Sequence, residues 1–210
     1  MNHEQATRGV VTVGDGRGFI VEGKFHRLVI TAAHCLPYFP PCSSISSTGE
    51  RTYEKLLGPL GKSPSIWAEC LFVDPVGDIA VLSAVDNQEW SEQADAYEVL
   101  MDAMTPLPIA HAPDDGAAWL LSLQGKWFTC RVKYPDRALW LSDAIEGIMG
   151  GMSGSPILAE NGQAIGVCVA GGGHLGEKLT EGGPNPTLAD GLPGWCLREI
   201  GKFTNGDAPV

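Results

Sequence analysis

The stretch Gly150-Gly151-Met152-Ser153-Gly154-Ser155-Pro156-Ile157 combines a serine hydroxyl with flanking glycines and continues into an apolar, strand-like run. Glycine tolerates positive φ and lets another backbone come close. Here it would leave the N–H groups of Gly151 and Ser153 free to point into one concavity, as an oxyanion hole requires. Taken alone, the segment also fits a glycine-rich hairpin turn, so its meaning depends on the rest of the chain.

Length and composition predict a globular protein made of many short strands. The chain has 210 residues, of which 44% are hydrophobic and 19% charged, enough for a buried core without disulfide or metal staples. Its 27 glycines and 15 prolines are typical of short strands joined by tight turns. The net charge of -11 argues against a nucleic-acid partner, because no basic stripe could neutralise phosphates.

The sequence also gives expectations about the cellular compartment and about metals, cofactors and disulfides. Residues 1–6 contain neither a basic region nor an apolar run, so no signal peptide is predicted and His3 is expected in a disordered tail. No run of about 18 apolar residues occurs, so we expect no membrane partner and a cytoplasmic protein. The six cysteines lack a C-x-x-C pair, so neither a metal nor a cofactor is expected. A disulfide between Cys35 and Cys42 stays open as an alternative in an oxidising compartment.

Short strand-like segments occur in both halves of the chain. They are residues 10–13, 18–21, 27–31, 66–73, 79–82, 118–123, 127–132, 138–141, 155–158 and 163–169. Residues 86–104 are polar and acidic, and are expected to connect two domains at 1–95 and 96–210. Residues 171–191 read as a glycine-dense loop, and 195–200 as a terminal helix. Many strands without long intervening helices predict an all-β fold of two antiparallel β-barrels with a short C-terminal helix.

Two glycine-rich segments do not fit a phosphate-binding loop. Residues 14–18 lead into the strand-like Phe-Ile-Val instead of a helix, which excludes a dinucleotide fingerprint. Residues 58–63 end in Gly-Lys-Ser, but Pro64 blocks the helix that a P-loop needs.

Two further segments carry groups that could act with Ser153. Thr31-Ala32-Ala33-His34-Cys35 ends an apolar strand, and Gly77-Asp78-Ile79-Ala80-Val81-Leu82 begins another with a carboxylate. A serine nucleophile needs a base, which a histidine can supply, and a carboxylate can orient the imidazole. Separately, such a histidine is also typical of a core or surface position, and such an aspartate of a turn that caps a strand. Together they predict Ser153 as nucleophile, His34 as base and Asp78 as the orienting acid.

In this order the three segments resemble the trypsin/chymotrypsin-like serine peptidases, in particular bacterial HtrA-like or glutamyl-endopeptidase-like members. The signatures Thr-Ala-Ala-His-Cys, Asp-Ile-Ala-Val-Leu and Gly-x-Ser-Gly-Ser-Pro follow the family's His, Asp, Ser order over roughly residues 10 to 200. The resemblance implies a chymotrypsin-like double barrel, a bacterial source and endopeptidase activity through an acyl-enzyme.

The chain departs from the animal trypsins at the activation switch. Met152 stands where they carry the aspartate that pairs with a processed N-terminus, and that N-terminal sequence is also missing. The resemblance therefore implies an oxyanion loop that is preformed or ordered by a partner. The half-cystine that would pair with Cys35 is expected near Phe19, where no cysteine occurs.

The resemblance also assigns a specificity pocket with its base at Gly147. The residues assigned to substrate binding are Gly147, Ile148, Met149, Cys168, Val169, Ala170 and Gly171. Gly147 offers no acid for a basic side chain, and Cys168 stands where glutamyl peptidases place a histidine. Cleavage is therefore expected after small-to-medium uncharged residues, with His174 as the one candidate for acidic specificity.

These observations predict a serine endopeptidase that acts on protein or peptide substrates. Two alternatives stay open: a binding or scaffold module on the same fold, and a latent peptidase whose residues 145–153 are ordered by an activating protein partner.

Overall fold

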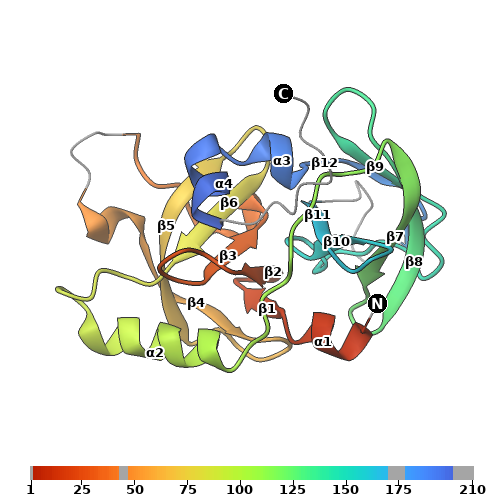
Figure 1. Ribbon diagram of the computed structural model, residues 1–210. Coiled ribbons are helices and arrows are strands. Elements are labelled where there is room, and N and C mark those ends of the chain that lie inside the picture. The colour runs from red at the N-terminus through yellow and green to blue at the C-terminus, as the bar shows by residue number, and fades with distance from the viewer. Residues whose placement is uncertain (1, 43–46, 170–177, 201–210) are drawn as a thin grey trace.

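The computed structural model describes residues 2–42, 47–169 and 178–200, and its strands form two units side by side (Figure 1). The first unit is a closed antiparallel barrel with the order β1-β2-β3-β6-β5-β4. Its strands are β1 (Val10–Val13), β2 (Gly16–Val21), β3 (Leu28–Thr31), β4 (Thr52–Pro59), β5 (Ile66–Asp74) and β6 (Ile79–Ser83). Pairing of β1 with β4 closes the barrel, with Val13 opposite Leu57.

The second unit is a curled antiparallel sheet with the order β11-β10-β7-β8-β9-β12. Its strands are β7 (Asp115–Leu121), β8 (Trp127–Lys133), β9 (Leu139–Ser142), β10 (Pro156–Ala159), β11 (Ala164–Val167) and β12 (Gly182–Asn185). A bridge between Gly166 and Thr187 brings the two ends of this sheet together. The predicted all-β, double-barrel fold is therefore confirmed, the second unit being a half-barrel.

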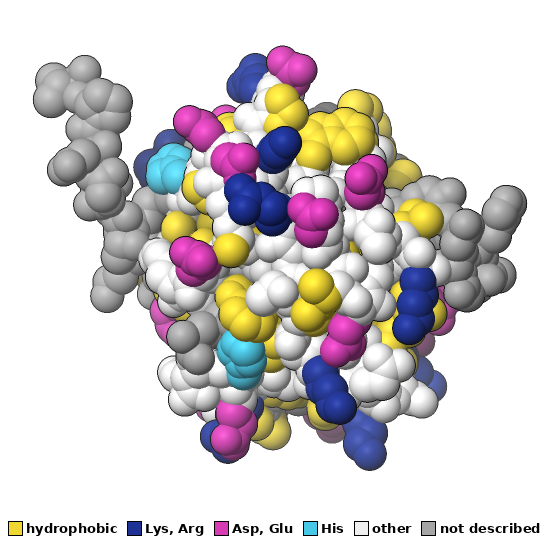
Figure 2. All heavy atoms as spheres, turned by 90° about the vertical axis from the view of Figure 1, so that its right-hand side faces the viewer, with side chains coloured by type: hydrophobic (Ala, Val, Ile, Leu, Met, Phe, Trp, Pro, Cys, Tyr) yellow, Lys and Arg dark blue, Asp and Glu magenta, His cyan; other side chains and the backbone are white. Residues whose placement is uncertain are grey.

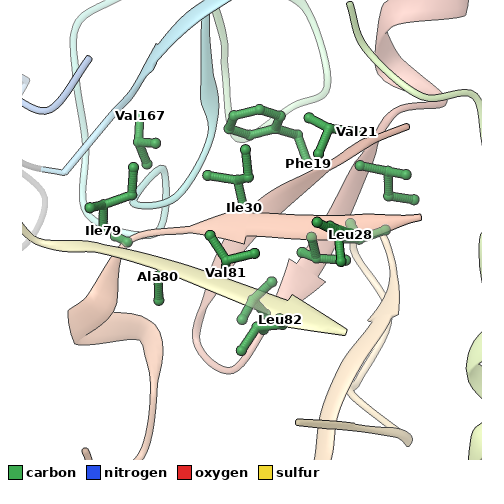
Figure 3. Close-up of a cluster of buried hydrophobic side chains, with 14 of the residues drawn as sticks. Phe19, Val21, Leu28, Ile30, Ile79, Ala80, Val81, Leu82 and Val167 are labelled. Carbon is green, nitrogen blue, oxygen red and sulfur yellow. The ribbon is translucent and has the colours of Figure 1, made fainter. Parts of the chain in front are cut away.

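The interior of the first barrel extends into the second unit. Every residue of β2, β3 and β6 is buried, as is expected for strands that are covered on both faces. Figure 3 shows Phe19, Ile30, Ile79 and Val81 gathered around one another, with Val167 of β11 beside them. A second cluster, which includes Leu120, Phe128, Leu141 and Ile157, fills the half-barrel. Because Val167 belongs to the first cluster, hydrophobic burial holds the two units together.

The segment between the two units begins as a helix. Residues Ser91–Asp102 form α2, which lies along the first barrel, and its buried Tyr97 donates a hydrogen bond to the carbonyl of Arg27. The domain boundary predicted at residue 95 thus falls inside α2. Beyond it, the N–H of Leu107 donates to Ile20 and that of Ala110 donates to Ala164, so the connection is bonded to both units.

The N-terminal helix contacts both units, because its buried Ala6 belongs to the first hydrophobic cluster and aromatic residues of the second unit bind it. Trp127 Nε1 lies 3.2 Å from the carbonyl oxygen of His3 and 2.9 Å from Thr7 Oγ1, within α1 (His3–Thr7). The His3 ring meets Trp119 edge-on, with 4.6 Å between centroids. The expectation of a disordered tail at His3 is wrong, because aromatic residues of β7 and β8 hold the helix.

The C-terminal helices pack on the first barrel. They are α3 (Leu188–Gly191) and α4 (Gly194–Ile200), so the predicted terminal helix is confirmed. Cys196 and Ile200 are buried in the first hydrophobic cluster, and the carbonyl of Glu199 accepts the N–H of Lys24. The C-terminal helices therefore pack on the opposite unit, and the N-terminal helix contacts both units (Figure 1).

Two strands lie where no strand was predicted. β4 carries the exposed residues Glu54 and Lys55, and its register shifts between Tyr53 and Leu57, so its apolar alternation is interrupted. β12 falls inside the segment that was expected to be a loop, and consists of glycine, proline and asparagine. β12 is formed by pairing with its neighbour and not by side chains that favour a strand, and β4 continues its pairing across the interruption.

The outer face of the half-barrel carries charges of both signs, which are interspersed over the part that is drawn in colour in Figure 2. Arg131 on β8 forms an ion pair with Asp115 on β7. Among the helices in the described ranges, none combines the length and the apolar character needed to cross a lipid bilayer. All six cysteines are free thiols, with Cys35 buried and Cys42 exposed.

Candidate active site

Two neighbouring strands of the first barrel bring His34 and Asp78 together. His34 lies in a single 3-10 turn, Ala33–Cys35, directly after β3, and Asp78 precedes β6. These strands pair with Thr31 opposite Ala80, so the end of one lies beside the start of the other. The His34 Nδ1 atom lies 2.6 Å from Asp78 Oδ2, and the main-chain N–H of His34 donates to Oδ1 over 2.9 Å.

The carboxylate sets the protonation of the imidazole ring. Because ionised Asp78 can only accept, Nδ1 carries the proton in this hydrogen bond, and Nε2 is the acceptor of the neutral ring. The hydrogen bond that His34 donates to Asp78 raises the pKa of His34 above its ordinary value, partial burial opposes the rise, and the charge of Asp78 adds to it. The His34 side chain is 47% exposed, so the ring remains accessible.

The loop that carries Ser153 comes from the second unit and is bonded to the first. The carbonyl of Ser153 accepts the N–H of Arg17, on β2, over 2.8 Å. The N–H of Gly154 donates to Cys168 over 2.7 Å, and that of Ser155 donates to Met152 over 3.0 Å. Ser153 is thus held between strands of both units.

Two glycines allow this close approach. Gly154 has φ +82°, and a Cβ atom there would overlap the carbonyl oxygen of Arg17. At Gly16, a Cβ atom would lie 2.5 Å from Cys35 Sγ and 2.8 Å from the carbonyl oxygen of Ser153. The residue that faces Cys35 is therefore Gly16, whereas Phe19, near which a pairing half-cystine was expected, is buried in the first hydrophobic cluster.

A pocket of about 490 Å³ lies at this junction, here called the junction pocket. His34, Cys35 and Gly16 line it from the first barrel, and Gly151 and Ser153 line it from the second unit. Among the described residues no hydrogen bond joins Ser153 Oγ to His34. Nucleophile–base contacts are often loose without substrate and tighten when it binds.

The main-chain N–H groups around Ser153 fall into two sets. Those of Met152, Gly154 and Ser155 donate to main-chain carbonyls. Those of Gly150, Gly151 and Ser153 donate to no acceptor within the described ranges. Gly151 has φ +88°, a conformation that glycine adopts at little cost. Of these three residues, Gly151 and Ser153, the two predicted oxyanion donors, line the junction pocket, and Gly150 does not.

The predicted specificity residues are mostly packed in the interior. Ile148 and Cys168 are buried in the cluster that fills the half-barrel, and Val169 is buried as well. Gly147 is closed off by Lys178, whose Cβ would lie 2.9 Å from a Cβ at that position.

The main chains of Ile148 and Met149, which precede the Ser153 loop, are hydrogen-bonded. Ile148 pairs with Leu179 in both directions, and the N–H of Met149 faces Met152 Sδ at 3.4 Å. The predicted residues Ala170 and Gly171, and also His174, lie outside the described residues.

Sequence reasoning missed Arg17. It is a cation that is only 6% exposed, on the strand beside the Ser153 loop. An arginine between two glycines gives no signal of burial by itself, and only its place in a strand of buried residues could have indicated it.

Comparison with models of known protein families found no match to this sequence, and comparison with curated proteins found none either. Within residues 2–42, 47–169 and 178–200, no three His, Cys, Asp or Glu side chains are grouped as a metal site would need.

Proposed function

We propose that this protein is a serine endopeptidase that hydrolyses peptide bonds through Ser153, His34 and Asp78. Ser153 is the nucleophile, His34 the general base and then acid, and Asp78 the residue that orients the imidazole. The N–H groups of Gly151 and Ser153 hold the oxyanion. No metal or organic cofactor takes part in this proposal.

The observation that carries the proposal is the double contact between Asp78 and His34 beside Ser153. An aspartate that merely ended a turn would need only a main-chain donor. Here the second carboxylate oxygen reaches the ring Nδ1 at 2.6 Å, which fixes the tautomer that a general base requires. That ring and Ser153 line the same pocket, from two different units of the fold.

The proposed reaction proceeds in two steps. Ser153 Oγ attacks the carbonyl carbon of the scissile bond while its proton passes to His34 Nε2, and the carbonyl oxygen becomes an oxyanion. The C–N bond then breaks, and the His34 proton goes to the leaving amine. A water molecule attacks the acyl-enzyme by the same route and releases the acid and the free serine. The order of the three segments, which resembles that of trypsin/chymotrypsin-like peptidases, supports this assignment.

We further propose cleavage after small-to-medium uncharged residues of a protein or peptide. Gly147 contributes no charge, and the neighbouring Ile148 and the facing Cys168 and Val169 are buried. Cleavage profiling with a peptide library would show Ala, Val or similar residues before the scissile bond. Dominance of Arg, Lys or Glu at that position would refute this specificity.

A fluorophosphonate probe, which labels activated serines covalently, tests the activity directly. The native chain would be labelled and Ser153→Ala would not. Ser155→Ala is the matched control, because Ser155 lies in the same loop but its hydroxyl is fully buried and has no hydrogen-bond partner in the described structure. Ser155→Ala would be labelled like the native chain.

The same experiment separates the two alternatives. Labelling only after addition of cell extract would indicate a latent peptidase that needs an activating partner. No labelling under either condition would favour a binding or scaffold module.

A further inference from the structure

We propose that Arg17 is a positioning residue, which sets the Ser153 nucleophile and the Gly151 oxyanion donor relative to His34. This inference rests on the proposed peptidase function. It is carried by the contacts of one buried side chain and of its own main chain, which together span the junction between the two units.

The Arg17 side chain is buried without an acidic partner in the described residues. Its Nη1 donates to the carbonyl of Leu121 over 2.7 Å, and its Nη2 donates to the carbonyl of Ser122 over 3.0 Å. A buried charge is costly unless it is paired or hydrogen-bonded. Burial lowers the pKa of Arg17, but a guanidinium stays charged at any ordinary pH. The carbonyl dipoles of Leu121 and Ser122 therefore stabilise the charge. The planar guanidinium of Arg17 in turn fixes the positions of these two carbonyls.

The main chain of Arg17 is hydrogen-bonded directly to the nucleophilic residue. Its N–H donates to the carbonyl of Ser153 over 2.8 Å, and its own carbonyl accepts the hydroxyl of Thr31 over 2.6 Å. Thr31 is the last residue of β3, three positions before His34. A short path of hydrogen bonds therefore leads from the strand that ends at the base, through Arg17, to the nucleophile.

The side chain of Arg17 also holds the turn that lies against the oxyanion donor Gly151. Leu121 ends β7, and the following residues Ser122 and Leu123 begin the turn to β8. Leu123 Cδ2 would lie 3.4 Å from a Cβ at Gly151, so this turn lies against the oxyanion glycine. By holding Leu121 and Ser122, Arg17 fixes the surface on which Gly151 rests.

Catalysis should depend on this arrangement, because displacement of reacting groups by about 1 Å can cost on the order of 100-fold in rate. Lysine would not replace arginine here. Its single ammonium cannot hold two carbonyls in the geometry of a planar fork. A lysine at this position keeps the charge and loses the positioning, which separates the two contributions.

Arg27, whose side chain is 27% exposed, provides a control for loss of an arginine that binds main-chain carbonyls. Its Nη1 donates to the carbonyl of Met101 over 2.6 Å and to that of Met104 over 3.4 Å. These contacts join the residue before β3 to the C-terminal end of α2, away from the junction pocket. Arg27→Met removes the same type of bond between a guanidinium and main-chain carbonyls, together with an ion pair to Glu22, without touching the Ser153 loop.

The test compares Arg17→Met, Arg17→Lys and Arg27→Met by fluorophosphonate labelling at increasing probe concentration. We expect the maximal labelling rate to fall roughly 100-fold in both Arg17 variants, with half-saturation changed by less than about 3-fold. Arg27→Met should label like the native chain after correction for its folded fraction. Labelling of both Arg17 variants within about 3-fold of Arg27→Met would overturn the proposal. If Arg17→Met does not fold, Arg17→Lys alone decides.

Amide hydrogen exchange makes the test independent of the proposed activity. Faster exchange at residues 121–124 and 150–154 in the Arg17 variants, but not in Arg27→Met, would support positioning even if the native chain took no label. In that case the peptidase proposal would fail while the structural role of Arg17 stood. Unchanged exchange at both segments would overturn the role of Arg17 whatever the labelling showed.

Discussion

The two oxygens of the Asp78 carboxylate bind different parts of His34, one its main-chain N–H and the other its ring Nδ1. Asp78 has φ +54°, an uncommon conformation for a residue with a side chain. The cost of that conformation is of the size of one good hydrogen bond, and here two hydrogen bonds offset it. The two hydrogen bonds to Asp78 thus fix the orientation of the His34 ring.

The pH dependence of labelling should report this contact. Activity requires the neutral ring, and the hydrogen bond to Asp78 raises the pKa of His34, so the acid limb should have its midpoint above the ordinary value of 6.5. In Asp78→Asn the midpoint should move to lower pH, while the plateau falls roughly 10³- to 10⁴-fold because the amide favours the wrong tautomer. A labelling profile between about pH 5 and pH 9 measures both effects.

Glu98→Gln is the control for that experiment. Glu98 lies 3.1 Å from the Nδ1 of the exposed His26, so the variant removes a histidine–carboxylate contact elsewhere on the surface. Its profile should coincide with that of the native chain. A midpoint that does not move in Asp78→Asn would mean that Asp78 does not tune His34.

Gly154→Ala should destabilise the fold strongly. Alanine at φ +82° is strained, and its Cβ would overlap the carbonyl oxygen of Arg17, so we expect a loss of roughly 2–5 kcal/mol in urea unfolding. Gly125→Ala has a similar φ of +75° with no atom within 4 Å of the new Cβ, and should lose only about 1–2 kcal/mol. Equal losses in the two variants would show that the Ser153 loop does not approach Arg17 closely.

Gly16→Cys should form a disulfide with Cys35. A Cβ at Gly16 would lie 2.5 Å from Cys35 Sγ, near enough for bonding after a small shift. Burial raises the pKa of the Cys35 thiol to about 11, so oxidation should be faster in alkaline buffer. Thiol titration of the unfolded chain should find two fewer thiols after oxidation than in the reduced variant. Gly16→Ala, which adds the same Cβ without a bond, should be less stable than the native chain. An unchanged thiol count would contradict the placement of Cys35.

Trp127→Phe should loosen the N-terminal helix. The variant loses the indole donor that binds the carbonyl of His3 and Thr7 Oγ1, which should cost about 1–2 kcal/mol and speed hydrogen exchange in residues 4–8. Trp140→Phe removes an indole from an exposed position and should change neither quantity. If exchange in residues 4–8 stayed the same in Trp127→Phe, the helix would be held by other contacts.

Much of the fold was predictable because hydrophobic pattern determines most of its strands. Continuous apolar runs such as Leu28–Thr31 and Ile79–Ser83 are buried on both faces, so their sequences report their surroundings directly. β4 and β12 were not predictable on this basis. The exposed Glu54 and Lys55 interrupt the apolar pattern of the first. The glycine and proline of the second favour turns, so pairing with a neighbouring strand makes it a strand.

The candidate site divides in a similar way. His34, Asp78 and Ser153 could be predicted because each stands in a short motif whose residue types are tied to chemistry. The contacts that bring them together could not, since they join residues far apart in the chain. Arg17 and Leu121 are the clearest example, because neither has a meaning until the two units are placed side by side. The buried specificity residues likewise depend on packing that no local pattern encodes.

The contacts of the terminal helices across the two units have a consequence for dividing the molecule into fragments. Cutting the chain within residues 103–110 would yield a first piece whose α1 lacks the aromatic surface of β7 and β8, and a second piece whose α4 lacks its apolar seat. Neither piece should persist alone. Each piece, however, carries a terminal helix that binds the other piece, so we expect the two halves to reassemble when co-expressed. The molecule would then suit a split reporter whose signal requires both fragments.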